Sequence, residues 1–140
     1  MSDKTFRLEV VTPERVVIAD DTVTSLVAPG VEGYLGVLAN HAALLTQLKV
    51  GELDIKRADG SEKAVAIGGG FMEVEGNTAI MLADTAELAE EIDVPRAEDA
   101  RRRAEERIGR REEEEIDASR AEAALARAIN RLHVAERAGL

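Results

Sequence analysis

Two kinds of hydrophobic spacing divide the chain near residue 88. Apolar and polar residues alternate through Phe6, Leu8 and Val10, which is the period of a half-buried strand, and Thr12-Pro13 ends this run. Similar runs follow at residues 15–18, 22–27, 52–56, 64–67, 70–74 and 78–82. Residues 1–88 are therefore predicted to form an all-β sandwich or barrel of about eight to ten strands.

From residue 89 onward, apolar residues recur three and four positions apart, which indicates helices. Asp93 is a suitable N-cap for the first helix, Gly109 suits its end, and Asp117 is the N-cap expected for the second. The predicted contact stripes are Val94, Ala97, Ala100, Ala104 and Ile108, then Ala118, Ala121, Leu125, Ala128, Leu132 and Ala135. Because the connector at 110–115 is short, residues 89–140 are expected to form an antiparallel two-helix hairpin. The fold class is α+β.

Alanine dominates the predicted contact between the helices. A buried methyl group contributes about 0.8 kcal/mol, whereas a buried Leu or Ile contributes roughly 1.5 to 3 kcal/mol. Such a hairpin is only marginally stable and needs a further partner, which suits a helix pair that exchanges one partner for another. A helical appendage without a switching role is equally compatible with this stripe.

Composition and charge exclude several kinds of partner and binding site. The net charge of −10 disfavours nucleic acid as a partner, and the absence of cysteine excludes disulfides and thiolate metal sites. No metal site is expected, because His41 and His133 lie far apart in the sequence. No apolar run is long enough to span a membrane, and the N-terminus lacks a signal peptide, so we expect a soluble intracellular protein.

The helical half contains a repeat: Ile92-Asp93-x-x-Arg96-Ala97 returns as Ile116-Asp117-x-x-Arg120-Ala121. One interpretation is two capped helix starts. The other is a polyphosphate clamp, because guanidinium groups bind phosphate oxygens bidentately. The arginines that share a helix face are Arg96, Arg103 and Arg107 in the first helix and Arg127 and Arg131 in the second. Ordinary pairing with Glu98, Asp99 and Glu106 is the alternative, and these residues alone favour it.

No catalytic constellation is apparent. The glycine-rich stretches 33–42 and 68–71 lack the Gly-Lys-Ser/Thr of a phosphate loop, so bulges and tight turns are the expected role of their glycines. His41 has no nucleophile arranged beside it, which favours a packing or hydrogen-bonding role. A small enzyme is therefore disfavoured.

Four stretches carry a resemblance that spans nearly the whole chain. They are Val11-Thr12-Pro13 with Glu14, Gly33 to Leu45, Gly69-Gly70-Phe71-x-Glu73-Val74, and Ala83-Asp84-Thr85-Ala86-Glu87. In this order they resemble the epsilon subunit of bacterial and chloroplast F-type ATP synthases. Ala39, Asn40 and Ala43 depart from the family's usual Pro, Gly and Pro, which affects the expected loop conformation.

The resemblance implies a non-catalytic rotor subunit of the central stalk that couples ion translocation to ATP synthesis. It implies that the sandwich binds the gamma subunit and the ring of c subunits, with the contact near Gly33, Tyr34, Leu35, Gly36 and His41. It also implies that the extended hairpin reaches the alpha and beta subunits and inhibits ATP hydrolysis. The expected location is the cytoplasmic side of the bacterial plasma membrane, held there by the complex.

In several bacterial members the folded hairpin binds ATP as a regulatory ligand, and no obligatory cofactor is implied. The positions that match that site are Glu87, Ile92, Asp93, Arg96, Ala97, Arg103, Arg127 and Arg131. Pro95 lies within the motif, where the first helical turn tolerates it. A freestanding nucleotide-sensing module built on the same arginines is the alternative function.

Overall fold

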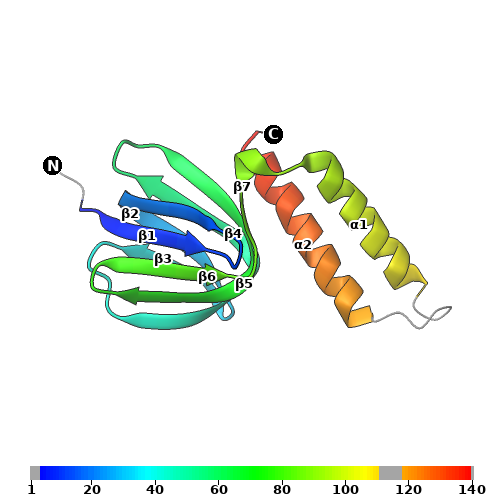
Figure 1. Cartoon of the computed structure of the whole chain (residues 1–140), viewed down its shortest axis with the longest axis horizontal. Coiled ribbons are helices and arrows are strands. Elements are labelled where there is room, and N and C mark those ends of the chain that lie inside the picture. The colour runs from blue at the N-terminus through cyan, green and yellow to red at the C-terminus, as the bar shows by residue number, and fades with distance from the viewer. Residues whose placement is uncertain (1–3, 111–117, 140) are drawn as a thin grey trace. The chain divides into compact units, whose positions relative to one another are not determined.

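The computed structural model describes residues 4–110 and 118–139, in two compact units, Met1–Leu88 and Ala89–Leu140 (Figure 1). The first unit contains seven strands: β1 (Phe6–Val11), β2 (Val16–Gly30), β3 (Gly33–Leu38), β4 (Leu44–Arg57), β5 (Glu62–Glu75), β6 (Thr78–Ala83) and β7 (Ala86–Leu88). The second contains a 3-10 turn, η1 (Ala89–Glu91), and two helices, α1 (Val94–Gly109) and α2 (Ala118–Arg137). The predicted α+β fold class is confirmed.

Five strands of the first unit close into a barrel. They follow the order β1-β6-β5-β4-β2, and β2 pairs with β1 again, so the sheet returns to its first strand. The β1–β6 pair is parallel and the other pairs are antiparallel. β3 extends the sheet beyond β2 and β7 pairs with β5, so β3 is an edge strand in the described part of the chain.

The strand count is lower than the eight to ten expected because three strands are long. β2 has 15 residues, and β4 and β5 have 14 each. The runs predicted separately at 15–18 and 22–27 belong to β2, whose register shifts let it pair first with β1 and then with β4. Such irregularities bend a strand without ending it, so one strand serves two parts of the barrel.

Glycines in β5 allow a similar change of partner. Gly70 pairs with Ala83 of β6, whereas Ile67 pairs with Ala86 of β7. Gly70 has a φ of 135°, and a Cβ there would lie 2.1 Å from the carbonyl oxygen of Leu82. Backbone conformation and space both require glycine at this position. The stretch 68–71 lies within strand β5, so the tight turn expected there is not present.

The second unit is a pair of antiparallel helices, visible side by side in Figure 1. The Asp93 carboxylate accepts a hydrogen bond from the Arg96 backbone N–H at 3.1 Å, which confirms the predicted N-cap. The predicted stripes are confirmed for the side chains that the structure describes, which leaves out Ala118. The remaining described positions of the stripes are half-buried, and five alanines are buried: Ala97, Ala104, Ala121, Ala128 and Ala135. The predicted cap Asp117, with Ile116 and most of the connector, lies outside the described residues.

Candidate functional site

A row of exposed apolar side chains crosses the outer face of the barrel. Phe71 of β5 is opposite Leu82 of β6, Leu82 is opposite Val11 of β1, and Val11 is opposite Val16 of β2. Phe71, Leu82 and Val16 are 53%, 58% and 58% exposed, and Val11 is half-buried. We call these four residues the apolar row, and sequence reasoning missed it. The signal was present, because adjacent apolar pairs such as Phe71-Met72 break the alternation of a strand and place one side chain outside.

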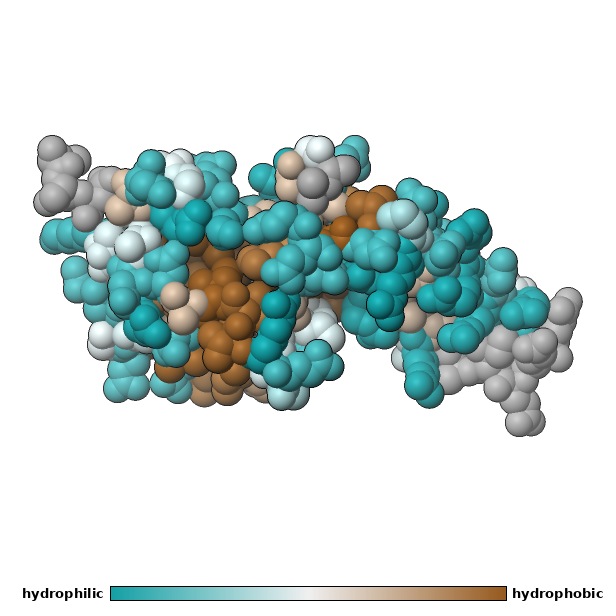
Figure 2. Space-filling model, turned by 45° about the horizontal axis from the view of Figure 1, so that its top comes forward, coloured by the Kyte–Doolittle hydropathy of each residue, from teal (hydrophilic) through white to brown (hydrophobic). Residues whose placement is uncertain are grey.

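The surroundings of the apolar row extend it and give it an acidic border. Leu45 on β4 is 69% exposed and lies two residues from Gln47, which is opposite Phe71, so Leu45 shares this face. Glu73 and Glu9 flank Ile80 in the neighbouring row of the sheet. Figure 2 shows apolar side chains gathered on the sandwich surface with polar ones around them. A partner for this face would offer apolar side chains and basic groups at the border.

The candidate contact residues from Gly33 to Gly36 lie on edge strand β3. Tyr34 and Gly36 are exposed on its outer face, whereas Leu35 packs against the barrel core. Gly33 has a φ of 136° at the start of the strand, which a larger residue adopts with difficulty. The strand therefore presents Tyr34 to solvent, and Leu35 supports the strand from inside.

His41 lies in the loop after β3, and Asn40 gives this loop its shape. Asn40 has a φ of 62°, the left-handed conformation that glycine would adopt at this position, so the departure from the family residue preserves the turn. Its backbone N–H donates to Asn77 Oδ1 at 2.7 Å, and Asn77 Nδ2 donates to the Thr5 carbonyl at 3.0 Å. The His41 Nδ1 lies 2.7 Å from the carbonyl oxygen of Ala42. The Asn40–Asn77 hydrogen bond thus ties the loop to the β5–β6 turn.

The candidate arginines of the hairpin fall on one side of it. At about 100° per residue, Arg96 and Arg103 lie on the same flank of the alanine seam of α1. The two helices are antiparallel (Figure 1). By the same spacing of about 100° per residue, Arg127 and Arg131 of α2 fall on that same side. Arg131 is half-buried and the other three are exposed. We call these four residues the arginine flank.

The ion pairs seen on α1 involve other arginines. Arg101 pairs with Glu105 at 3.6 Å, and Arg102 pairs with Asp99. The carboxylate of Asp99, one of the acidic neighbours expected to neutralise the clamp arginines, pairs with Arg102.

The remaining candidate ATP residues have different environments. Ile92 and Ala97 are buried, and Ala97 belongs to the seam between the helices. The carboxylate of Asp93 caps α1, as described above. Glu87 is half-buried on β7, opposite Ala66 of β5, and thus belongs to the first unit. The structure therefore brings the arginines to one side of the hairpin and leaves Glu87 in the other unit.

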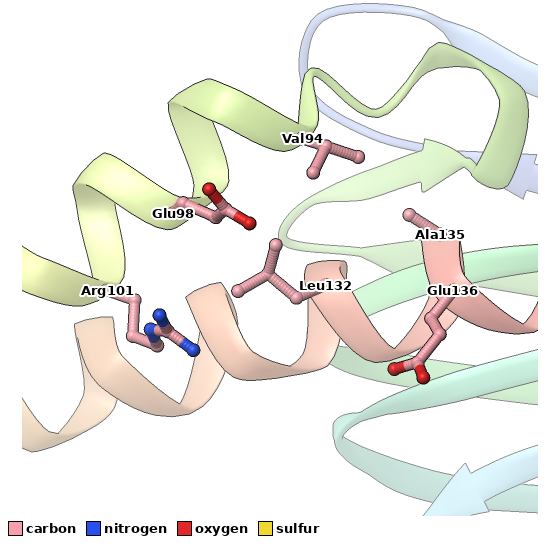
Figure 3. A pocket seen from close by; sticks show the side chains of 6 residues that line it. All are labelled: Val94, Glu98, Arg101, Leu132, Ala135 and Glu136. Atoms are coloured by element: carbon pink, nitrogen blue, oxygen red, sulfur yellow. The ribbon is translucent and has the colours of Figure 1, made fainter. Parts of the chain in front are cut away.

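An open pocket of about 280 Å³ lies on the hairpin (Figure 3). By helical spacing, its lining residues fall on the other flank of the alanine seam from these arginines. Side chains from both helices line it: Val94, Glu98, Arg101, Leu132, Ala135 and Glu136. No candidate ATP residue is among them. Two exposed carboxylates with one guanidinium offer little attraction to a polyphosphate, so the pocket and the arginine flank are separate features.

Two further findings concern metals and membranes. Within residues 4–110 and 118–139, no group of three or more His, Asp or Glu side chains is placed to hold a metal ion. None of the helices in that part of the chain is both long and apolar enough to cross a membrane.

A closed barrel with an apolar row on its surface, followed by a two-helix hairpin, defines the chain as a two-domain protein of the α+β class. Residues 5–89 match the family described as the ATP synthase delta/epsilon chain, beta-sandwich domain, and residues 90–136 match its long alpha-helix domain. The chain belongs to this family of ATP synthase delta/epsilon chains, which confirms the resemblance and the expectation of a non-catalytic subunit of that complex.

Individual relatives agree with this assignment. The ATP synthase epsilon chain of Pelotomaculum thermopropionicum is 58% identical over 111 residues, which cover 79% of this chain and 81% of the relative. That of Desulforamulus reducens is 50% identical over 133 residues, or 95% and 98% of the two chains. A chain of the Euglena gracilis mitochondrial ATP synthase, described as OSCP/F1/c-ring, has the same fold with a TM-score of 0.77 and 23% identity, over 96% of this chain and 81% of that one.

Proposed function

We propose that this chain works in the central stalk, where its sandwich binds the gamma subunit through the apolar row and the ring of c subunits through the outer face of β3. The apolar row carries the proposal. Contiguous apolar surface across four strands is costly to leave in water, and it fits a lasting, largely dry protein interface. The smaller β3 face, which exposes Tyr34, Gly36 and Leu38, fits a second and weaker contact. The complex then holds the chain at the cytoplasmic side of the membrane.

One double variant and one control variant separate the two surfaces. Phe71→Ser with Leu82→Ser removes the centre of the apolar row, and both side chains are exposed, so the barrel core is preserved. Leu38→Ser is the matched control, because Leu38 is 65% exposed on β3. Binding of each variant to purified gamma subunit is measured by calorimetry. We expect the affinity for the gamma subunit to fall at least tenfold in the double variant and to stay at the wild-type value in the control. Equal affinities of the two variants would reject the apolar row as the gamma-binding surface.

We further propose that the hairpin inhibits ATP hydrolysis when it extends toward the alpha and beta subunits, and that ATP holds it folded. The arginine flank supports this proposal, because guanidinium groups on two helices can bridge one polyphosphate and so add to a weak alanine seam. A ligand that binds only the folded hairpin stabilises that state by mass action.

The ATP proposal is tested by titrating the whole chain with ATP and ADP. Arg103→Ala and Arg131→Ala each remove one guanidinium from the arginine flank, and Arg101→Ala is the matched control on the pocket side of α1. We expect the first two variants to weaken ATP binding about tenfold or more, in line with the loss of a charge-assisted bond, and the control to bind normally. No binding by the wild type, or equal weakening in all three, would leave helix capping as the explanation of the repeat.

Inhibition is tested in the assembled complex. A chain that ends at Leu88 keeps the barrel and its apolar row and lacks the hairpin. Added to ATP synthase stripped of this subunit, it should restore coupling and give faster ATP hydrolysis than the full chain. Equal hydrolysis with both chains would argue against inhibition. A full chain that binds ATP without joining the complex would instead support the freestanding nucleotide-sensing module.

A further inference from the structure

Tyr34 is held in a defined position although it is 54% exposed. Its side chain starts on edge strand β3 and reaches the second strand away, β4, where its hydroxyl oxygen accepts a hydrogen bond from the Glu52 backbone N–H at 3.3 Å. The Nζ atom of Lys49 lies 5.5 Å from the centroid of the ring, within the range of a cation–π contact. An exposed aromatic ring with contacts at its tip and over its face has little freedom to turn.

Gly51 provides the space for this arrangement. A Cβ atom at Gly51 would lie 2.9 Å from the Tyr34 hydroxyl oxygen and 2.5 Å from the Cβ atom of Pro29. Pro29 is the residue opposite Tyr34 in the β2–β3 pair, so the hydroxyl and the proline ring meet above the same glycine. Gly51 is therefore needed for close approach of these side chains, since any larger residue would displace the hydroxyl or the proline.

We infer that Gly51 and Lys49 are positioning residues, which fix Tyr34 as a pre-organised contact for the c-ring on the β3 face. This inference rests on the proposed c-ring contact of that face. Tyrosine gives a large contact area with few rotatable bonds, and a ring already fixed in the free chain loses little entropy on binding. The exposed half of the ring is the part that a partner covers, while the hydroxyl stays bound to β4.

The sequence offers a direct probe, because Tyr34 is the one tyrosine in the chain and there is no tryptophan. Full-length chain labelled with 3-fluorotyrosine therefore gives one fluorine resonance, which reports the surroundings of this ring alone. Gly51→Ala and Lys49→Gln are the test variants. Lys56→Gln is the charge-matched control on the same strand.

We expect the resonance to move in both test variants and to stay in place in the control. Purified c-ring in detergent should shift the wild-type resonance, and the affinity should fall at least fivefold for Gly51→Ala and by a smaller factor for Lys49→Gln. Unlabelled Tyr34→Phe, which keeps the ring and loses the hydroxyl contact, should also bind more weakly. If Gly51→Ala fails to fold, Lys49→Gln and Tyr34→Phe decide the question.

Different results would reject the proposed c-ring contact and the inference about Gly51 and Lys49. A wild-type chain that does not bind the c-ring would reject the proposed contact of the β3 face. A wild-type chain that binds, together with test variants whose resonance moves while their affinity is unchanged, would overturn the inference about Gly51 and Lys49. Unchanged resonances in the variants would overturn it as well.

Discussion

The barrel and the hairpin bury different kinds of side chain. The barrel core consists mainly of large residues, among which Leu8, Leu53, Ile67, Met72 and Met81 are fully buried. The centre of the hairpin seam consists of alanines, and its larger residues Leu125 and Leu132 are only half-buried. Burial of a large apolar side chain contributes roughly 1.5 to 3 kcal/mol, against about 0.8 kcal/mol for one methyl group. The barrel is therefore expected to be the more stable of the two units.

The largest effect is expected in the barrel core. Leu53→Ala removes a side chain with no exposure and leaves a cavity, so the free energy of unfolding should fall by about 2 to 5 kcal/mol. Tyr34 fluorescence follows the barrel during denaturation, and ellipticity at 222 nm follows mainly the helices, which tests the two units in one sample. Leu45→Ala is the control at an exposed position and should change stability little. A comparable loss in both variants would contradict the assigned core.

A somewhat smaller effect is expected from a larger side chain in the alanine seam. Ala104→Leu forces the helices apart, and overpacking of this kind costs about 1 to 3 kcal/mol. Because the hairpin has little stability to lose, its helical signal should melt at a lower temperature while the tyrosine signal is unchanged. Ala126→Leu, at an exposed position of α2, is the control and should leave both signals in place. If Ala104→Leu stabilised the hairpin, the seam would be looser than its buried alanines indicate.

The sequence predicted the local features of both units and missed those that depend on pairing. The alanine stripe and the Asp93 cap follow from spacing within one helix, so they were predictable. The closed barrel forms because β2 pairs with both β1 and β4. The apolar row forms because residues far apart in the chain lie opposite one another in the sheet. The pre-positioned ring of Tyr34 depends on Gly51 two strands away. No periodicity within a single segment carries that information.

Loss of the helix cap should have a local effect of about 1 kcal/mol. Asp93→Ala removes the acceptor of the Arg96 backbone N–H at the start of α1. Hydrogen exchange should become faster in the first turn of α1, with the barrel amides unaffected, because the two units have separate cores. Asp99→Ala, within the same helix, should leave that first turn protected. Unchanged exchange in Asp93→Ala would mean that water or another group replaces the carboxylate.

The smallest effect concerns a polar network at the β4–β5 turn of the barrel. Asp20 Oδ1 accepts hydrogen bonds from the Thr22 hydroxyl at 2.6 Å and backbone N–H at 2.7 Å, and Asp20 Oδ2 lies 3.6 Å from an Arg57 guanidinium nitrogen. Arg57 also donates to Ser61 Oγ at 2.8 Å, and Ser61 donates to the Asp59 carboxylate. Burial opposes ionisation of Asp20, but the Thr22 hydrogen bonds and the Arg57 charge outweigh it and lower its pKa. Hydrogen bonds from Ser61 lower the pKa of Asp59.

A carboxyl whose pKa is lower in the folded state stabilises the fold above its unfolded pKa, which is about 3.9 for aspartate. That contribution is lost as the pH falls through the folded value. Barrel stability, measured by urea unfolding with tyrosine fluorescence, should therefore decrease with acidification below about pH 4. Asp20→Asn should flatten this dependence, and Thr22→Val should flatten it less because it keeps the carboxyl and the backbone hydrogen bond. If neither variant changed the slope, the acid sensitivity of the barrel would come from carboxylates outside this network.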